Sequence, residues 1–587
     1  MRAAQGDPLA ARALLEHAVA LDPEATEARA ALGLALVSLD LGDEASRHLE
    51  AALRAAPERA EIQNNLGSAY GLMGKDEQAV AAWRSALRLQ PGLAEACLNL
   101  GDHYVGRGDY SAALSVFQEG ARHNPEHKAF LERLLYAKQH LCDWDGLEPL
   151  SARRLRLLEE RPDEASAPFG LLFLQSTAAQ QLACASALAR SLEKRARRVG
   201  HSRLSPKAVA RPRIRIGYLS ADFREHVMAY ILAELFELHD RRAFELFGYS
   251  FGADDGSAMR RRVEVAMEHF VDIRALSDRA AAERIREDGI DVLVDLNGYT
   301  HGARSAILDQ RPAPVQVNFL GYPGTMGGSL MDYIVVDHFI FREGDAAHYA
   351  EQPVFMPACY APNDRRRDAR PTPSRAELGL PQDGFVFCCF NQSAKITPAI
   401  FDVWMRILGA QPGSVLWLLE GSAASSANLR REALRRGVAA ERIVFAPRAA
   451  IDTYLGRIPA ADLFLDTAPY NAHTTAADAL WAGVPVLTCP GGTFASRVAG
   501  SMSVAAGMNE LVVPSWPEYE RLALNFARRP QDLRAFRHRL AAARTSAPLF
   551  DMPAFSRSLE AAYRRMRDRA VAGLPPAPID LPKFVSG

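Results

Sequence analysis

The sequence predicts a multidomain protein in which a helical solenoid precedes an α/β region of two lobes, each with a parallel sheet. Two observations carry this prediction: residues recur at a fixed spacing in the first quarter of the chain, and strand and helix patterns alternate from about residue 211 onward. Stacked helical repeats produce the first signal, and parallel sheets with helices on both faces produce the second. A Pro- and Arg-rich stretch at 362–375 divides the alternating region into two series.

The composition is that of an ordinary globular chain. With 587 residues, the chain is long enough for about three or four domains of roughly 100–200 residues each. Apolar residues make up 48% and charged residues 24%, and 69 Lys plus Arg balance 70 Asp plus Glu. A net charge of −1 argues against a globally basic nucleic-acid-binding protein, so we expect no nucleic acid among the partners.

The chain shows no signal for membrane insertion or secretion. No apolar run approaches about 18 residues, the length that a membrane-spanning helix needs. The first residues, MRAAQGDPLAARALLEHAVALDP, contain neither the apolar core nor the cleavage site of a signal peptide. The seven cysteines are scattered without a CxxC pair, which favours free thiols in a reducing compartment over disulfides or a zinc site. We therefore expect a cytoplasmic protein that does not enter a membrane.

The first quarter of the chain repeats with a period of 34 residues. A Leu-Gly pair early in the unit, a small residue in the middle and Pro at the end are typical of tetratricopeptide repeats, which are pairs of antiparallel helices. Pro separates the units, and each pair buries its apolar face only by stacking on a neighbour. We assign residues 1–126 to these repeats and residues 127–210 to a helical extension that links them to the next region. The recurring residues are Pro23, Pro57, Pro91 and Pro125; Leu32-Gly33, Leu66-Gly67 and Leu100-Gly101; and Ala45, Ala79 and Ala113.

Two asparagines occupy equivalent positions in successive repeats. Asn65 and Asn99 each precede the Leu-Gly pair, so stacking of the repeats aligns them in a row. A row of amides can bond a peptide backbone whatever its side chains, and this predicts a groove for protein or peptide partners. The alternative is that both are ordinary solvated residues, and Ala31 at the equivalent place in the preceding repeat keeps any such row short.

Strand patterns and helical stretches alternate over the rest of the chain. The alternation predicts parallel sheets with helices on both faces, in one lobe at 211–375 and a second at 376–587. Neither GxGxxG after the first strand nor a GxxxxGKS/T pattern occurs, so an NAD-type or P-loop site loses its main support. Two such lobes bind ligands in the cleft at their strand ends. Strands are expected at 213–220, 243–250, 290–296, 315–320, 333–337, 385–390, 415–420, 442–446, 463–466 and 484–489.

The most informative segment is LDTAPYNAHTTAADALWAGVPVLTCPG, at 465–491. A strand ends at Asp466, and a helix begins at Thr474 and Thr475, whose free backbone N–H groups and hydroxyls suit an anion. Asp478 lies one turn further on, where it can accept hydrogen bonds from the hydroxyls of a ribose. The alternative is a plain Thr N-cap followed by a surface Asp.

A second segment places a lysine beyond the end of a predicted strand. In FCCFNQSAKITPAIF, at 387–401, Lys395 lies in the loop that opens the next helix. A Lys in this place can reach a diphosphate and neutralise the charge that develops on a leaving group. The alternative is an ordinary solvated Lys.

Three further segments follow strands in the first lobe. SADFREHVMAY, at 220–230, places His226 just after the first strand, where it is a candidate general base. The glycines of NGYTHGAR, at 297–304, and of GYPGTMGG, at 321–328, allow the backbone to approach a ligand closely. Alone, each signal is weak, because the chain has 15 histidines and each glycine segment could equally be only a turn.

Taken together, these segments resemble the O-GlcNAc transferase family. The resemblance rests on tandem repeats followed by DFxxH, NGYTxGAR, RPAPxQ, GYPGTxG, FNQxxKI, LDTxxxNxHTTxxDxLWAGxPV, ASRV and APLF, and it covers about residues 15–570. It implies that the two Rossmann-like lobes form a GT-B glycosyltransferase fold. The repeat array is far shorter than in animal members, so the chain looks like a bacterial member.

The resemblance also implies roles for individual residues. His226 matches the family's proposed base or acceptor-site histidine, and Gln392 with Lys395 matches the pair that contacts the phosphates of the donor. Tyr454 stands near the uracil where animal members have His, and Arg448 replaces a Lys, which preserves the charge but not the geometry. The donor site further includes Ala446, Arg457, His473, Thr474, Thr475 and Asp478, and the candidate acceptor or sugar site comprises Asn297, Tyr299, Thr300, Gly321, Pro323, Gly324 and Thr325.

The activity that the resemblance implies is an inverting transfer of GlcNAc from UDP-GlcNAc to Ser or Thr hydroxyls of proteins. The hydroxyl would attack the anomeric carbon through an oxocarbenium-like transition state. Lys395 and the helix start at 474–475 would stabilise the departing diphosphate, so no metal or other cofactor is expected. Two alternatives stay open: a related enzyme with another donor or acceptor, such as UDP-glucose or Asn, and a repeat scaffold with an idle UDP-binding region.

Overall fold

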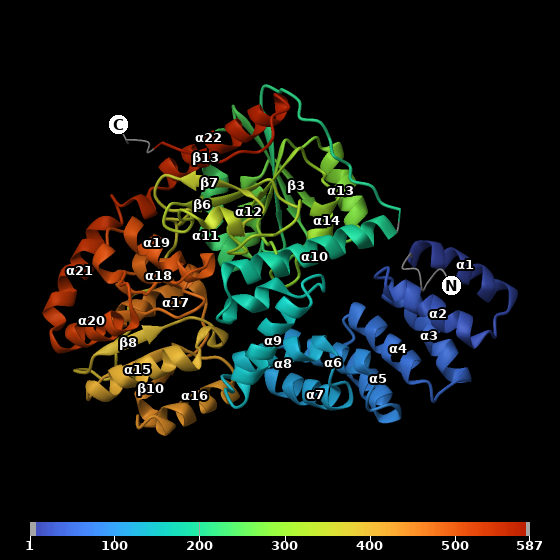
Figure 1. The fold of residues 1–587 in the computed structure, drawn as a ribbon, viewed down its shortest axis with the longest axis horizontal. Coiled ribbons are helices and arrows are strands. Elements are labelled where there is room, and N and C mark those ends of the chain that lie inside the picture. Colours follow the sequence, from blue (N-terminus) through green and yellow to red (C-terminus); the bar gives the residue numbers. More distant parts are fainter. Residues whose placement is uncertain (1–7, 199, 583–587) are drawn as a thin grey trace. The chain divides into compact units, whose positions relative to one another are not determined.

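The computed structural model of the chain describes residues 8–198 and 200–582, which form two compact units (Figure 1). One unit contains the chain up to residue 154 together with 194–201, and the other contains 155–193 and the chain from 202 onward. Within the described residues, no helix is both long enough and apolar enough to cross a lipid bilayer. All seven cysteines are buried.

The first unit consists of antiparallel helices in which each helix packs on the next. The predicted repeats are confirmed, and the recurring prolines lie in the short turns between helix pairs. Leu66 and Leu100 occupy equivalent buried positions on successive first helices of a pair. The helices are α1 (Pro8–Leu21), α2 (Thr26–Val37), α3 (Gly42–Ala55), α4 (Ala60–Leu72), α5 (Asp76–Leu89), α6 (Ala94–Gly106), α7 (Tyr110–His123), α8 (Lys128–Leu141) and α9 (Leu147–Glu160), the last of which continues into the second unit.

The glycine of each Leu-Gly pair lets the two helices of a repeat approach closely. A Cβ atom on Gly67 would lie 2.6 Å from the Trp83 ring, and one on Gly101 would lie 2.1 Å from the Phe117 ring. Real Cβ atoms do not approach other atoms so closely, and a close-packed core has no free volume to relieve the overlap. The repeating glycine is therefore a packing requirement of the solenoid.

The first sheet of the second unit is parallel throughout, in the order β13-β7-β6-β5-β4-β1-β2-β3. Its two faces bury separate cores, because successive residues of a strand point to opposite faces. Tyr218 and Val294 pack with helices α11, α12 and α22 on one face, and Leu219 and Leu293 pack with α10, α13 and α14 on the other. The strands are β1 (Ile214–Ser220), β2 (Phe244–Ser250), β3 (His269–Asp272), β4 (Val292–Asp295), β5 (Val315–Asn318), β6 (Tyr333–Asp337), β7 (Gln352–Met356) and β13 (Ile579–Asp580). The helices are α10 (Ala178–Arg198), α11 (Val227–Leu238), α12 (Ala258–Ala266), α13 (Asp278–Glu287), α14 (Ser305–Asp309) and α22 (Met552–Val571).

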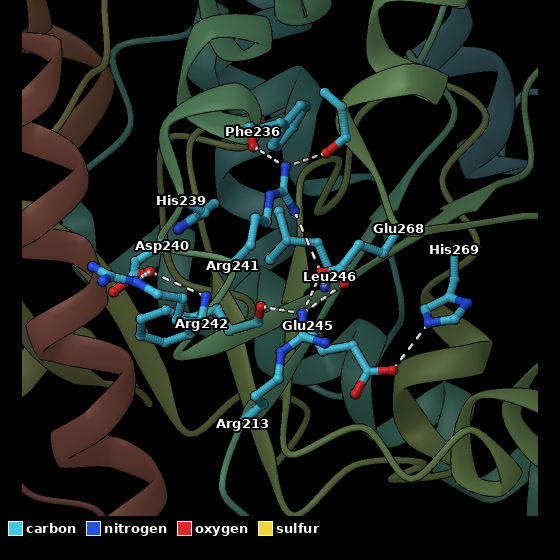
Figure 2. A network of polar contacts seen from close by, with 12 residues as sticks. Arg213, Phe236, His239, Asp240, Arg241, Arg242, Glu245, Leu246, Glu268 and His269 are labelled. Carbon is cyan, nitrogen blue, oxygen red and sulfur yellow. Dashed lines mark hydrogen bonds and ion pairs between the residues drawn. The ribbon is translucent and has the colours of Figure 1, made fainter.

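A network of charges joins the amino ends of three strands of this sheet (Figure 2). Arg213, just before β1, pairs with Glu268 at 2.5 Å, and Arg241 approaches the same carboxylate at 3.8 Å. On the neighbouring strands, Nε2 of His269 lies 3.0 Å from a carboxylate oxygen of Glu245. These side chains are partly exposed, so the network aligns strands without contributing much stability. Ligands bind beyond the carboxyl ends of parallel strands, so this edge lies opposite the expected site.

The second sheet is also parallel, in the order β10-β9-β8-β11-β12. Helices α15 and α16 begin at side-chain caps: the Thr397 hydroxyl accepts from the Ile400 N–H before α15, and the Ser422 hydroxyl accepts from the Ser425 N–H before α16. The strands are β8 (Val386–Cys389), β9 (Val415–Leu419), β10 (Ile443–Ala446), β11 (Leu463–Leu465) and β12 (Val486–Leu487). The helices are α15 (Pro398–Ala410), α16 (Ala423–Arg435), α17 (Ile451–Arg457), α18 (Thr474–Trp481), α19 (Val498–Ala505), α20 (Trp516–Arg528) and α21 (Pro530–Ala543).

The structure corrects two of the domain boundaries expected from the sequence. Helix α22 and strand β13, which we expected within the second lobe, belong to the first: β13 pairs with β7, and Tyr563 and Met566 lie in the core beside α11. Figure 1 shows the red helix α22 beside the first sheet and away from the orange helices α20 and α21. The expected extension at 127–210 is divided, because residues 155–193 belong to the second unit. An apolar helix face packs equally well on either sheet, so its sequence does not identify its partner.

Candidate functional site

Each sheet has one point at which the strand order reverses direction. This switch lies between β1 and β4 in the first sheet and between β8 and β11 in the second. Ligands of open parallel sheets bind at such points, beyond the carboxyl ends of the strands. The loops at these points hold the segments singled out in the sequence, namely 220–226 after β1, 297–304 after β4, 391–395 after β8 and 466–475 after β11.

Lys395 is buried at the switch point of the second sheet, at the end of the short 3-10 helix Ser393–Lys395. Its Nζ donates to the backbone carbonyl of Asn471 at 2.7 Å and lies 3.6 Å from the centroid of the Tyr470 ring. Burial lowers the pKa of Lys395 to about 7, an effect that the carboxylate of Asp466 opposes. No carboxylate of the described residues forms an ion pair with it. Lys395 is therefore not a solvated surface lysine; it is a buried amine, about half protonated at pH 7, that forms no ion pair with a described carboxylate.

The first turn of α18 lies beside this lysine. Its backbone N–H groups at Thr474 and Thr475 precede the first intrahelical hydrogen bonds, as at any helix start. The Thr475 hydroxyl donates to the side-chain oxygen of Asn391, which ties the turn to the loop after β8. His473 precedes the helix, and its Nε2 lies 3.2 Å from the carbonyl oxygen of Ala495. Burial and the nearby Lys395 lower the pKa of His473 far below its usual range, so its ring is neutral.

A second buried cation lies at the carboxyl end of α17. Arg457 donates through Nη1 to the carbonyl of Pro447 at 2.5 Å, but its Nε and Nη2 atoms are buried without a hydrogen-bonding partner. The guanidinium carbon lies 5.6 Å from the Phe390 ring centroid and 5.5 Å from that of Tyr454. Buried polar groups are normally bonded, so two unbonded guanidinium nitrogens indicate a missing acceptor. Among the other residues expected at the nucleotide, Ala446 is buried at the end of β10, Gln392 is half-buried and Arg448 is exposed.

Asp478 does not lie open to solvent as a surface carboxylate would. It is buried on α18 and accepts a hydrogen bond from Nη1 of Arg367 at 2.6 Å. The Tyr454 hydroxyl is buried close by. Burial raises the pKa of Asp478, while Arg367 and Tyr454 act in the opposite direction. Sequence analysis did not identify Arg367, because a residue 111 positions away cannot be paired with Asp478 from spacing alone.

In the first lobe, the structure joins two of the sequence segments. His226 is the N-cap of α11, and its Nδ1 lies 3.3 Å from the Met228 backbone nitrogen and 3.5 Å from a carboxylate oxygen of Asp222. Asp222 in turn accepts from the side-chain amide of Asn297 at 3.0 Å. That amide also reaches the Thr300 hydroxyl at 3.4 Å. Burial lowers the pKa of His226, and Asp222 opposes the effect. Because Nδ1 accepts from the Met228 N–H, the neutral ring carries its hydrogen on Nε2. The partly exposed ring can take a proton at Nε2 only after that hydrogen has moved to Nδ1, which then faces Asp222.

The remaining residues expected at the acceptor or sugar site shape the loops that surround it. The buried hydroxyl of Tyr299 donates to the carbonyl of Met326 at 2.7 Å, and the buried hydroxyl of Thr325 donates to Glu351 at 2.6 Å. These hydroxyls donate to other loops, so a direct contact of either with a ligand stays a prediction. Pro323 and Gly324 are buried next to them. A Cβ on Gly321 would lie 1.9 Å from the Leu296 carbonyl, so only glycine permits this crossing of the two loops.

Aromatic residues that sequence analysis missed support the lysine. Phe173, at the end of the 3-10 helix Pro168–Phe173, lies 5.2 Å from the Tyr470 ring centroid, and Phe169 lies 6.3 Å from it. Tyr470 in turn lies against Lys395. The segment that we expected to be a helical extension and linker therefore packs on the ring that lies against Lys395. Among residues 8–198 and 200–582, no group of His, Cys, Asp and Glu side chains is arranged so that it could hold a metal ion.

In the repeat unit, the two asparagines of the expected row are both half-buried. The Asn99 side-chain amide donates to Asn64 at 2.9 Å and to the Ser68 hydroxyl at 3.3 Å. Asn65 accepts from the Asn64 amide at 3.3 Å. The amides therefore bond one another across the repeats, which fixes their orientation. A peptide-binding role for them stays a prediction.

The sequence matches known families over most of its length. Residues 193–369 and 364–559 match glycosyl transferase family 41, and residues 2–68, 60–92 and 98–137 match tetratricopeptide repeats. The chain belongs to glycosyl transferase family 41. Family 41 membership confirms the resemblance to O-GlcNAc transferases that the motifs indicated.

Relatives and solved structures agree with the family 41 assignment. A probable UDP-N-acetylglucosamine–peptide N-acetylglucosaminyltransferase (SEC) of Arabidopsis thaliana is 40% identical over 371 residues, 62% of this chain and 38% of that protein. The corresponding transferase of Caenorhabditis elegans is 30% identical over 476 residues, 62% of this chain and 41% of that protein. The chain thus spans about two fifths of the length of these relatives. The structure of an O-GlcNAc transferase mutant from Thermobaculum terrenum superposes with a TM-score of 0.68 at 29% identity, covering 94% of this chain and 99% of that one. The two sheets accordingly form the lobes of a GT-B-like domain, as the sequence predicted.

Proposed function

We propose that this chain transfers GlcNAc from UDP-GlcNAc to Ser or Thr hydroxyls of proteins, with inversion at the anomeric carbon. The observation that carries the proposal is the pair of buried cations, Lys395 and Arg457, that lie at one edge of the second sheet without carboxylate partners. Burying an unpaired charge is unfavourable, so such a site is built for an anion. A nucleoside diphosphate offers phosphate oxygens to Lys395 and to the first turn of α18, and uracil carbonyls to Arg457.

The proposed leaving-group chemistry follows from the position of Lys395. Negative charge grows on the diphosphate as the bond to the sugar breaks, and a donor fixed in a dry site stabilises that charge more than it stabilises the ground state. The Tyr470 ring and the Asn471 carbonyl fix the ammonium in place before the donor arrives. Because the protein itself supplies this positive charge, the proposed reaction needs no metal ion at the diphosphate.

His226 is the proposed base on the acceptor side. For Nε2 to take the hydroxyl proton, the ring hydrogen must first move to Nδ1, which then donates to Asp222, 3.5 Å away, and gives up the hydrogen bond that it accepts from Met228. Asn297 holds Asp222 in place for this role. His226→Ala should lower kcat by about 100-fold or more, the usual contribution of a general base. If this variant changes only the KM for the acceptor, His226 positions the substrate and is not the base.

The proposal is tested by titration calorimetry with UDP, UDP-GlcNAc and UDP-glucose in the presence of EDTA, followed by transfer of labelled sugar to peptides. We expect micromolar binding without metal, tighter for the GlcNAc donor than for the glucose donor, and labelled Ser or Thr. Lys395→Met should abolish transfer, whereas Lys207→Met, which changes an exposed lysine outside the site, should not. Binding of UDP without transfer to any acceptor would leave the repeat-scaffold alternative, and preference for UDP-glucose would favour the other-donor alternative.

A further inference from the structure

The segment between the two lobes is anchored on the first lobe by a row of ion pairs. The side chain of Asp364 pairs with Arg262 of α12 at 2.8 Å and accepts from the backbone nitrogen of Glu234 on α11 at 3.1 Å. Arg365 pairs with the Glu234 carboxylate at 2.6 Å. Asn363 and Asp364 are fully buried. This segment therefore has a fixed position relative to α11, the helix that begins at His226.

Arg367 extends from this anchored segment to the nucleotide side of the second lobe. Its Nε donates to the carbonyl of Asp364 at 3.0 Å, Nη2 donates to the side chain of Asn363, and Nη1 donates to Asp478 at 2.6 Å. Its guanidinium also lies over the Trp481 ring, 5.4 Å from the centroid. All three nitrogens are thus engaged, and the side chain is buried. A guanidinium fixed on every side presents one N–H in one direction, which is the property that positions a carboxylate.

We propose that Arg367 is a positioning residue for the nucleotide: it holds the carboxylate of Asp478 in the orientation that recognises the ribose hydroxyls of a nucleoside diphosphate. One oxygen of Asp478 is bonded to Arg367, and the second oxygen, with the Tyr454 hydroxyl nearby, is the proposed acceptor for a ribose hydroxyl. The ion pair also favours the ionised form of Asp478 against the effect of burial, and an ionised carboxylate is the stronger acceptor. This inference rests on the proposed function, because it assigns Asp478 a ribose.

A purely structural role for Arg367 predicts a different outcome from a positioning role. If Arg367 only holds the lobes together, its loss lowers the affinity for every nucleotide by the same factor. If it orients Asp478, its loss lowers the affinity only for those nucleotides that carry the recognised hydroxyl. The informative quantity is therefore the ratio of affinities for UDP and for its deoxy analogues, rather than the affinity itself.

The experiment measures binding of UDP, 2′-deoxy-UDP and 3′-deoxy-UDP to the full chain by titration calorimetry. The wild type should prefer UDP over at least one deoxy analogue by about tenfold, the contribution of one charge-assisted hydrogen bond. Arg367→Gln should bind UDP about tenfold more weakly and lose the preference, and it should raise the KM for the sugar donor more than it lowers kcat. Arg367→Lys, which keeps the charge without the planar fork, should recover part of the preference.

Two further variants keep the test decisive. Arg366→Gln is the matched control, because Arg366 is the adjacent, largely exposed residue and pairs with Glu237 of α11 instead of α18. Its ratio of affinities for UDP and for the deoxy analogues should equal that of the wild type. Asp478→Asn should lose the preference for UDP over the deoxy analogues, as Arg367→Gln does. The double variant should bind UDP no more weakly than Asp478→Asn alone.

The possible results separate the two proposals. If the wild type binds none of the nucleotides, the proposed function itself is wrong. If the wild type binds UDP selectively and Arg367→Gln keeps that selectivity, the positioning role is refuted while the proposed function stands. Thermal unfolding of each variant identifies any that fails to fold, and Arg367→Lys with Asp478→Asn then carry the comparison.

Discussion

Binding of UDP-GlcNAc should draw a proton onto Lys395, and the size of this uptake follows from its surroundings. Burial lowers the pKa of this lysine from 10.5 to about 7 in the free protein. A bound diphosphate supplies the missing negative charge, which favours the ammonium and raises the pKa toward its ordinary value. Full recovery from about 7 to 10.5 corresponds to about 5 kcal/mol in favour of the charged form, an upper limit for this contribution.

The uptake depends on pH in a defined way. With a pKa of about 7 when free, Lys395 is about half protonated at pH 7 and about one-tenth protonated at pH 8. Binding should therefore take up about 0.5 proton at pH 7 and about 0.9 at pH 8, and affinity should fall by up to about tenfold per pH unit above pH 7. Titration calorimetry in buffers of different ionisation enthalpy measures the uptake directly. The sugar donor suits the assay better than UDP, because the terminal phosphate of UDP itself titrates near neutral pH.

A variant separates the proton uptake of Lys395 from that of its neighbours. The carboxyl of Asp466, whose pKa burial raises to about 7, can also take up a proton when an anion binds. Lys395→Met removes the lysine contribution and leaves that of Asp466, so the difference between the two proteins belongs to Lys395. Equal uptake in both, or no uptake by the wild type at pH 8, would refute the reasoning.

Three further outcomes are expected. In the folded protein Lys395 has a lower pKa than in the unfolded chain, so the unfolded state binds more protons between pH 7 and 10.5. As the pH rises through this range, burial of the lysine destabilises the fold progressively less. Lys395→Met should therefore raise the melting temperature more at pH 6 than at pH 9. Gly101→Val should destabilise the repeats by about 1–3 kcal/mol by overlap with Phe117, whereas Gly106→Ala, whose Cβ would meet no atom within 4 Å, should be nearly neutral in the same chemical denaturation. Removing residues 552–587 should expose the core of the first lobe, seen as strong binding of a hydrophobic dye, although the cut lies beyond the second sheet.

The parts of the fold that follow from local pattern could be predicted from the sequence. The strands that became β1, β2 and β4 to β6 are buried apolar runs, and they lie within the expected ranges. Strand β3 (His269–Asp272) was missed because, at the edge of the sheet, it has no fully buried residue to produce such a run. Strand β7 (Gln352–Met356) was missed because it is short and contains Pro353.

The site could be predicted only in part, because only some of its contacts follow from local sequence pattern. Residues beyond strand ends, such as Lys395, are found because the topology of a parallel sheet brings all those loops to one edge. Arg367 lies in a segment without strand or helix, and its contact with Asp478 depends on how the whole chain packs. Tyr299 shows the converse limit, since its motif follows a strand of the site but spacing did not indicate that its hydroxyl bonds a neighbouring loop.

The return of the C-terminal helix to the first lobe has a consequence for the order in which the protein is made. Met552 to Met566 complete the core that α11 and the central strands leave open, yet the ribosome adds them after the entire second sheet. At roughly 5–20 residues per second, synthesis of that sheet and its helices takes on the order of 10–30 s. Throughout that interval the nascent first lobe exposes an apolar surface that no other described element covers. The order of the chain therefore leaves this surface uncovered until synthesis is almost complete, and a circular permutant that begins with this helix would shorten the exposure.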